Sequence, residues 1–220
     1  MAKIKDPVSG FSHLIGMIAS IVGLVFLIVF AVKYGEGTYD VVSFSIFGTG
    51  LIFLYAASSF YHLLNLKEKA TAVLRRIDHI MIYILIAATY TPICLGPLRG
   101  GLGWSIFGVV WGLAIVGLFL TIFWLHAPRW IRTGLYLTMG WIAIIVIYPM
   151  IIKFQELGAF ASLIWLLAGG LFYTIGAVIY GLKWPKLKNK LFSFHEIFHI
   201  FILLGSLCHF WFIFRYVLYI

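Results

Sequence analysis

Seven apolar stretches fill nearly the whole sequence, and they constrain its fold more than any other feature. Each is about 20 residues long or somewhat longer, which is the length that an α-helix with a rise of ~1.5 Å per residue needs to cross a ~30 Å hydrocarbon core. They run over residues 11–32, 41–64, 77–95, 104–125, 133–152, 157–182 and 191–214. Only 10% of the residues are charged, far below the ~25% of soluble domains. We therefore expect an all-α, polytopic membrane protein in which residues 1–220 form a single seven-helix domain.

Lysine and arginine are distributed unequally between the two sets of loops. Twelve would lie on the side of the N-terminus, and the other side would receive only Lys33, Arg99, Lys153 and Arg215. The twelve are Lys3, Lys5, Lys67, Lys69, Arg75, Arg76, Arg129, Arg132, Lys183, Lys186, Lys188 and Lys190. Basic loops are retained in the cytoplasm, so the pattern predicts a cytoplasmic N-terminus, an outer C-terminus and insertion in a plasma membrane.

The net charge of +9 belongs to these short loops beside anionic lipid head groups. It therefore predicts membrane lipids as partners and excludes a nucleic-acid binder. Oligomeric state is left open by the sequence.

A few polar side chains fall inside the apolar stretches, where an ionisable group costs at least ~2.5 kcal/mol and is by default a functional candidate. Ser58 and His62 close the second stretch, Asp78 opens the third, and His195 and His199 open the seventh. Because successive spans reverse direction, all five lie near the same membrane boundary. Helix packing can bring them together there.

Their spacing points to a metal. His195 and His199 are four residues apart and share a helix face, as two ligands of a helical zinc site do, and His62 supplies a third nitrogen. Three protein ligands and a water form the catalytic zinc pattern. Asp78 is the best-placed base for that water, and Ser58 is a candidate to bind the water or an oxyanion. A metal-free polar cluster or proton relay is the alternative interpretation.

The remaining histidines are expected to play smaller roles. His209 lies ten residues beyond His199, ~15 Å deeper by helical rise, so we expect it to make a separate polar contact. His13 is a candidate outer partner of the metal ligands. His79 points away from Asp78 and should pack elsewhere, and His126 is expected at an inner helix end.

The same region contains a competing motif. His195, Glu196 and His199 spell H-E-x-x-H, in which two histidines bind zinc and the glutamate is the base of a metalloprotease. An intramembrane protease with Glu196 in place of Asp78 is therefore a second hypothesis. In the simpler interpretation, Glu196 faces the interface and has no catalytic role.

The pattern Ser58-x-x-x-His62, Asp78 and His195-x-x-x-His199 resembles the signature of the hemolysin III and progestin/adipoQ receptor family, within the wider superfamily that contains alkaline ceramidases. The resemblance covers the whole chain and looks most like a bacterial hemolysin III-type member. It implies seven helices, with His62, His195 and His199 as zinc ligands, Asp78 acting on the metal-bound water and Ser58 as the signature serine.

The resemblance implies several activities. Some relatives are zinc-dependent lipid amide hydrolases, eukaryotic receptors sense hormones, and bacterial members have haemolytic or membrane-homeostasis roles. We expect a zinc hydrolase acting on a lipid amide or ester. The alternatives are a non-enzymatic regulator or receptor-like protein with structural zinc, a cytolytic pore, and the intramembrane protease.

Overall fold

The computed structural model describes residues 5–35, 37–124, 127–187 and 192–218, and every regular element within them is helical. The elements are α1 (Pro7–Tyr34), α2 (Thr38–Leu63), α3 (Glu68–Leu95), α4 (Gly101–Phe123), α5 (Arg129–Trp141), α6 (Ala143–Glu156), η1 (Phe160–Ser162), α7 (Leu163–Leu182), α8 (Phe194–Phe212) and η2 (Ile213–Val217). The expected all-α class is confirmed. Interpretations that involve Lys3, His126, Lys188, Lys190 or the predicted span ends 125 and 191 fall outside the described residues.

Seven of these helical segments are long and apolar enough to cross a membrane, as predicted. The fifth span, Arg129–Glu156, is made of α5 and α6 in succession. Large apolar side chains remain exposed on the outside of the bundle, among them Val25 on α1 and Ile145 on α6. In a bilayer these side chains contact lipid, because the hydrocarbon is as apolar as they are.

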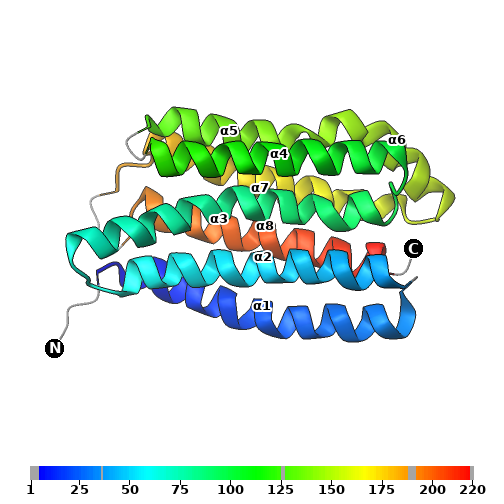
Figure 1. Cartoon of the computed structure of the whole chain (residues 1–220), viewed down its shortest axis with the longest axis horizontal. Coiled ribbons are helices and arrows are strands. Elements are labelled where there is room, and N and C mark those ends of the chain that lie inside the picture. Colours follow the sequence, from blue (N-terminus) through cyan, green and yellow to red (C-terminus); the bar gives the residue numbers. More distant parts are fainter. Residues whose placement is uncertain (1–4, 36, 125–126, 188–191, 219–220) are drawn as a thin grey trace.

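The helices lie roughly along one common axis (Figure 1). Contacts between them follow the chain order, and α8 closes a ring against α1. Small residues allow the close contacts on α1. A Cβ at Gly16 would lie 2.7 Å from Leu203 of α8, and one at Gly23 would lie 2.8 Å from Phe210 of the same helix. Small residues at helix interfaces are the usual means of close packing in membranes. These contacts bring the first and the last membrane-spanning helices together along one side of the bundle.

The fifth span is interrupted between Trp141 and Ala143, where we expected one continuous helix over residues 133–152. The hydroxyl of Tyr90 on α3 inserts at the break. It interacts with the carbonyl oxygens of Met139 at 3.0 Å and Gly140 at 2.6 Å, and accepts from the backbone N–H of Ala143 at 2.8 Å. A side chain inserted into the helical hydrogen-bond ladder is a recognised cause of a helix bend.

Candidate metal centre

Three histidine nitrogens meet at the end of the bundle where α2 ends and α8 begins. Nε2 of His195 lies 3.2 Å from Nε2 of His62 and 3.2 Å from Nε2 of His199. The three candidate ligand atoms all lie within 4.8 Å of one another. Two imidazole nitrogens at ~2.0–2.1 Å from one tetrahedral ion would be separated by roughly 3.3 Å. The two 3.2 Å separations match this value, so the three histidines form a group that can hold a metal ion.

The local sequence of α8 fixes two of these ligands. Ser193 is the N-cap residue, and its hydroxyl accepts a hydrogen bond from the backbone N–H of His195 at 3.2 Å. The one-turn spacing then places His199 on the same face as His195. His62 and His199 are both buried, whereas His195 is half-buried.

Glu196 has a structural position at the start of α8. One carboxylate oxygen accepts from the backbone N–H of Ser193 at 2.7 Å and from its hydroxyl at 2.6 Å. The other oxygen accepts from the Ser9 hydroxyl at 2.9 Å, which joins α8 to α1. Ser193 and Glu196 thus form a capping box. This use of the carboxylate disfavours Glu196 as the base of a protease.

Asp6 is a site residue that our sequence reasoning did not identify. It occupies the N-cap position of α1 without making a side-chain cap. Its Oδ2 instead lies 3.0 Å from Nδ1 of His62. A histidine that donates its Nδ1–H to a carboxylate presents the lone pair of Nε2 to a metal, the arrangement found around many zinc ligands. An aspartate just before a proline at a helix start was the available signal in the sequence.

The N-terminal segment holds Asp6 against α2 by further contacts. The backbone N–H of Asp6 donates to the His62 carbonyl at 3.0 Å. The Lys5 ammonium lies 3.8 Å from Oδ2 of Asp6 and 3.8 Å from the centre of the Tyr61 ring. The segment before α1 therefore reaches the end of α2 beside the candidate centre.

His13 of α1 lies directly against the candidate ligands. Its ring stacks on that of His199, with centroids 3.9 Å apart and an interplanar angle of 27°. The His13 ring also meets the Tyr55 ring edge-on, with centroids 5.0 Å apart. Its ring thus packs against one ligand, and its nitrogens are not among the three that converge.

Asp78 and Ser58 lie close to each other on α3 and α2. The Asp78 carboxyl interacts with the Ser58 hydroxyl, and both residues line a cavity that also reaches His195 and His199. Asp78 does not belong to the group of converging ligand atoms. It is placed beside the candidate centre rather than in its ligand set. The structure leaves the predicted chemical roles of Asp78 and Ser58 as predictions.

His79 was expected to pack away from this region, but it lines the same cavity. Its Nδ1 lies 3.2 Å from a guanidinium nitrogen of Arg132 on α5. The backbone carbonyl of His79 accepts from the Tyr136 hydroxyl at 3.3 Å. His79 therefore joins α3 to α5 and is absent from the group of converging ligand atoms.

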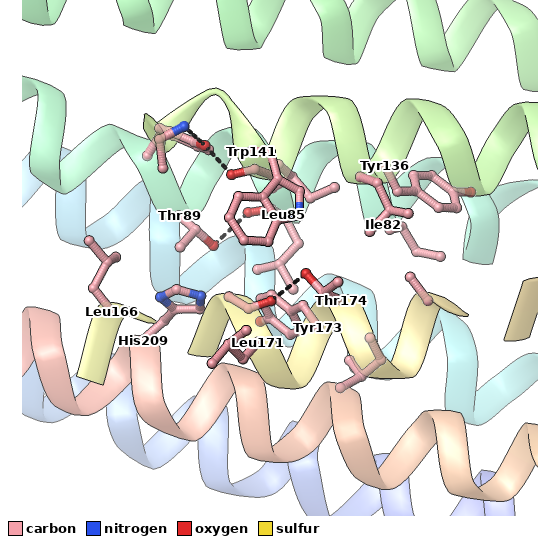
Figure 2. A pocket seen from close by; sticks show the side chains of 18 of the residues that line it. Ile82, Leu85, Thr89, Tyr136, Trp141, Leu166, Leu171, Tyr173, Thr174 and His209 are labelled. Carbon is pink, nitrogen blue, oxygen red and sulfur yellow. Dashed lines mark hydrogen bonds between the residues drawn. The ribbon is translucent and has the colours of Figure 1, made fainter. Parts of the chain in front are cut away.

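The cavity has a volume of about 290 Å³ and extends into the membrane-spanning part of the bundle. Its walls come mainly from α3, α5, α6, α7 and α8, with further residues from α1 and α2, and most of its lining side chains are apolar. It begins at His195 and Asp78 and continues to Cys94 and Met150 toward the opposite end. Figure 2 shows the middle of the cavity, with Leu85, Leu166 and Leu171 among its lining residues.

The cavity also reaches the outer surface between α6 and α7. Ile144 of α6 and Leu167 of α7 both line it, yet both are more than half exposed on the outside of the bundle. These two helices make few close contacts with each other. On this side, therefore, the same residues line the cavity and face the outside of the bundle.

Fold and site together define a class: a seven-helix integral membrane protein with an internal cavity and a three-histidine candidate metal centre at one end of the bundle. Residues 1–210 match the family model described as haemolysin-III related. The chain belongs to the haemolysin III-related family.

Relatives from bacteria and animals show the extent of the similarity. The hemolysin-3 homolog of Bacillus subtilis (strain 168) is 41% identical over 207 residues, which are 94% of this chain and 92% of the relative. Hemolysin-3 of Bacillus cereus is 36% identical over 214 residues, covering 97% and 92%. The monocyte to macrophage differentiation factor of Homo sapiens is more distant, at 26% identity over 220 residues, covering 94% and 82%.

Proposed function

We propose that this protein is a zinc-dependent hydrolase that cleaves a lipid amide or ester in a bacterial plasma membrane. The observation that carries the proposal is the convergence of three Nε2 atoms, from His62, His195 and His199, at the end of an apolar cavity. Neutral imidazoles suit zinc, and three of them leave a fourth position open in the pattern of catalytic zinc sites.

The proposed orientation places the candidate centre near the cytoplasm. At its end of the bundle the described residues include nine lysines and arginines, against four at the other end. The nine are Lys5, Lys67, Lys69, Arg75, Arg76, Arg129, Arg132, Lys183 and Lys186. The positive-inside tendency then supports a cytoplasmic N-terminus and access of cytoplasmic water to the centre.

In the proposed reaction, the three histidines hold the ion, and Asp6 keeps His62 in the tautomer that binds it. Zinc supplies a Lewis acid that polarises a carbonyl group and allows water to act as a nucleophile near neutral pH. Asp78 accepts a proton from the attacking water and returns it to the leaving amine or alcohol. The Ser58 hydroxyl donates a hydrogen bond to the oxygen of the substrate carbonyl.

A lipid fits the remainder of the cavity. Its apolar walls complement an acyl chain, while the polar residues at one end complement the bond to be cleaved. Ile144 and Leu167, which line the cavity, are also exposed toward the region that holds lipid chains. We propose that the substrate enters there with its head toward the three histidines.

The test combines metal analysis with hydrolysis of defined lipids. Purified protein should contain one zinc per chain and should release fatty acid from ceramides, other N-acyl lipids or lipid esters supplied in mixed micelles. Asp78→Asn should retain the zinc and lose at least 100-fold in hydrolysis, because it removes the proposed proton acceptor. A wild-type protein without bound zinc, or an Asp78→Asn variant with full activity, would remove the basis of the proposal.

The same preparations distinguish the alternatives. A regulator or receptor-like protein with structural zinc would show no hydrolysis and would unfold when a chelator removed the metal. A cytolytic pore would release a dye from liposomes with or without zinc. A protease would cleave a membrane peptide and would lose that activity in Glu196→Gln rather than in Asp78→Asn.

A further inference from the structure

His209 is a buried polar side chain that the proposed centre does not use. It lies on α8 and lines the cavity, and only 6% of its surface is exposed. Its Nδ1 is buried without a hydrogen-bond partner among the described residues. An ionisable side chain inside a membrane span usually has a hydrogen-bond or charge partner within the protein. A buried one without such a partner is a candidate for ligand binding.

Packing holds the His209 ring in place. A Cβ at Gly169 of α7 would lie 2.7 Å from Nε2 of His209, so only glycine allows this approach of the imidazole to α7. The Tyr173 ring lies 5.2 Å away, centre to centre, on the same wall of the cavity. Figure 2 shows His209 and Tyr173 close together, with Thr89 across the cavity.

The neighbouring hydroxyl groups already have hydrogen-bond partners within the protein. Tyr173 and Tyr55 both hydrogen-bond to the Ser206 hydroxyl, at 2.8 and 2.6 Å. Thr89 donates to the Leu85 carbonyl at 2.8 Å. By contrast, Nδ1 of His209 has no hydrogen-bond partner among the described residues. The imidazole is therefore the polar group here that is most available to bind a ligand.

We propose that His209 forms a second polar subsite, which binds a hydroxyl group in the middle of an acyl chain. This inference rests on the proposed function, because it places the carbonyl end of that chain at the three-histidine centre. A neutral imidazole has one donor and one acceptor nitrogen, and a hydroxyl can pair with either. The rest of the nearby wall, including Leu166 and Leu171, accommodates methylene groups.

The depth of His209 sets the position of that hydroxyl. Ten residues separate His199 from His209, which is ~15 Å along the helix axis. An extended alkyl chain with carbon–carbon bonds of about 1.5 Å advances ~1.25 Å per bond, so 15 Å corresponds to roughly 12 bonds. A hydroxyl near the twelfth carbon therefore matches the subsite.

The experiment measures fatty acid binding to the full-length, zinc-loaded protein in detergent. Octadecanoate, 12-hydroxyoctadecanoate and 6-hydroxyoctadecanoate compete with a fluorescent fatty acid for the cavity. The 12-hydroxy acid should displace the probe at a concentration at least ~10-fold lower than octadecanoate, because a site built to hydrogen-bond a hydroxyl discriminates against its absence. The 6-hydroxy acid should gain nothing, since its hydroxyl would lie roughly six carbon–carbon bonds short of His209.

Variants assign the effect to His209. His209→Phe should lose the preference while still binding octadecanoate, and His209→Gln should keep part of it, because an amide can still hydrogen-bond. Leu207→Met, a change of similar volume at an exposed position of α8 outside the cavity lining, should leave the preference intact. Zinc content checks that each variant is folded.

Two results separate this inference from the proposed function. Equal binding of octadecanoate and both hydroxy acids by the wild type would overturn the subsite and leave the hydrolase proposal standing. Failure of all three acids to displace the probe would count against both. The wild-type comparison decides the question even if a variant does not fold.

Discussion

Oδ2 of Asp6 lies 3.0 Å from Nδ1 of His62, so a residue before the first helix orients a candidate metal ligand at the end of the second. The pairing explains why Asp6, although it occupies the N-cap of α1, makes no side-chain cap there. Its carboxylate is used by the site instead.

Replacing Asp6 by alanine should weaken zinc binding ~10–100-fold, the usual cost of losing a carboxylate behind a ligating histidine. Asp6→Asn should have a smaller effect, because an amide oxygen can still accept from Nδ1. Competition against a chelator of known affinity gives the measurement. Glu68→Gln is the matched control, since it removes an exposed carboxylate near the same end of the bundle. Equal zinc affinity in Asp6→Ala and wild type would rule out the orienting role.

Replacing His199 by glutamine should abolish stoichiometric zinc, because it leaves only two of the three converging nitrogens. His79→Gln should retain the metal, since His79 contacts Arg132 and is not in that group. Elemental analysis of the two purified variants makes the comparison. If His79→Gln lost zinc while His199→Gln kept it, the ligand set would be wrong.

Glu196→Ala should destabilise the protein by about 1 kcal/mol, because it breaks the capping box at the start of α8. The zinc content and the rate of hydrolysis per folded molecule should stay close to wild type. Unfolding in a detergent titration measures the first effect, and the lipid assay measures the second. A large loss of hydrolysis in the conservative Glu196→Gln variant would point back to this residue as the base.

Tyr90→Phe should lower the free energy of unfolding by about 1–2 kcal/mol, because it removes the hydroxyl that satisfies backbone groups at the break between α5 and α6. Hydrogen exchange should increase at the backbone amide of Ala143, whose N–H loses its acceptor. Tyr148→Phe is the control, because Tyr148 lies on α6 with 69% of its surface exposed. An unchanged exchange rate at the break would show that the hydroxyl does not stabilise it.

Hydropathy predicted the number of spans, but it made some of the helices too short at their ends. The third span was expected from Ile77, whereas α3 begins at Glu68. The additional turns carry Lys69, Arg75 and Arg76, whose charges end an apolar stretch without ending a helix. Long basic side chains can extend from such a helix into the head-group region, so the helix continues beyond the hydrocarbon.

The convergence of three histidines could be predicted because it depends on simple helical geometry. His195 and His199 are one turn apart, and His62 lies at the same membrane boundary. The partnership of Asp6 with His62 depends on how the chain before α1 folds back, and no periodic pattern encodes that. The break in the fifth span was also not predicted, because Tyr90, whose hydroxyl inserts at the break, lies on another helix.

The pairing of α2 with α8 has a consequence for how the protein is made. His62 and His195 are 133 residues apart in sequence, and α8 is the last of the seven membrane-spanning segments described. During synthesis the first ligand enters the membrane long before its two partners. A tight three-histidine site therefore cannot exist until the final segment has been inserted and packed beside α1. Acquisition of metal would thus mark completed assembly, and newly made chains halted before α8 should remain metal-free.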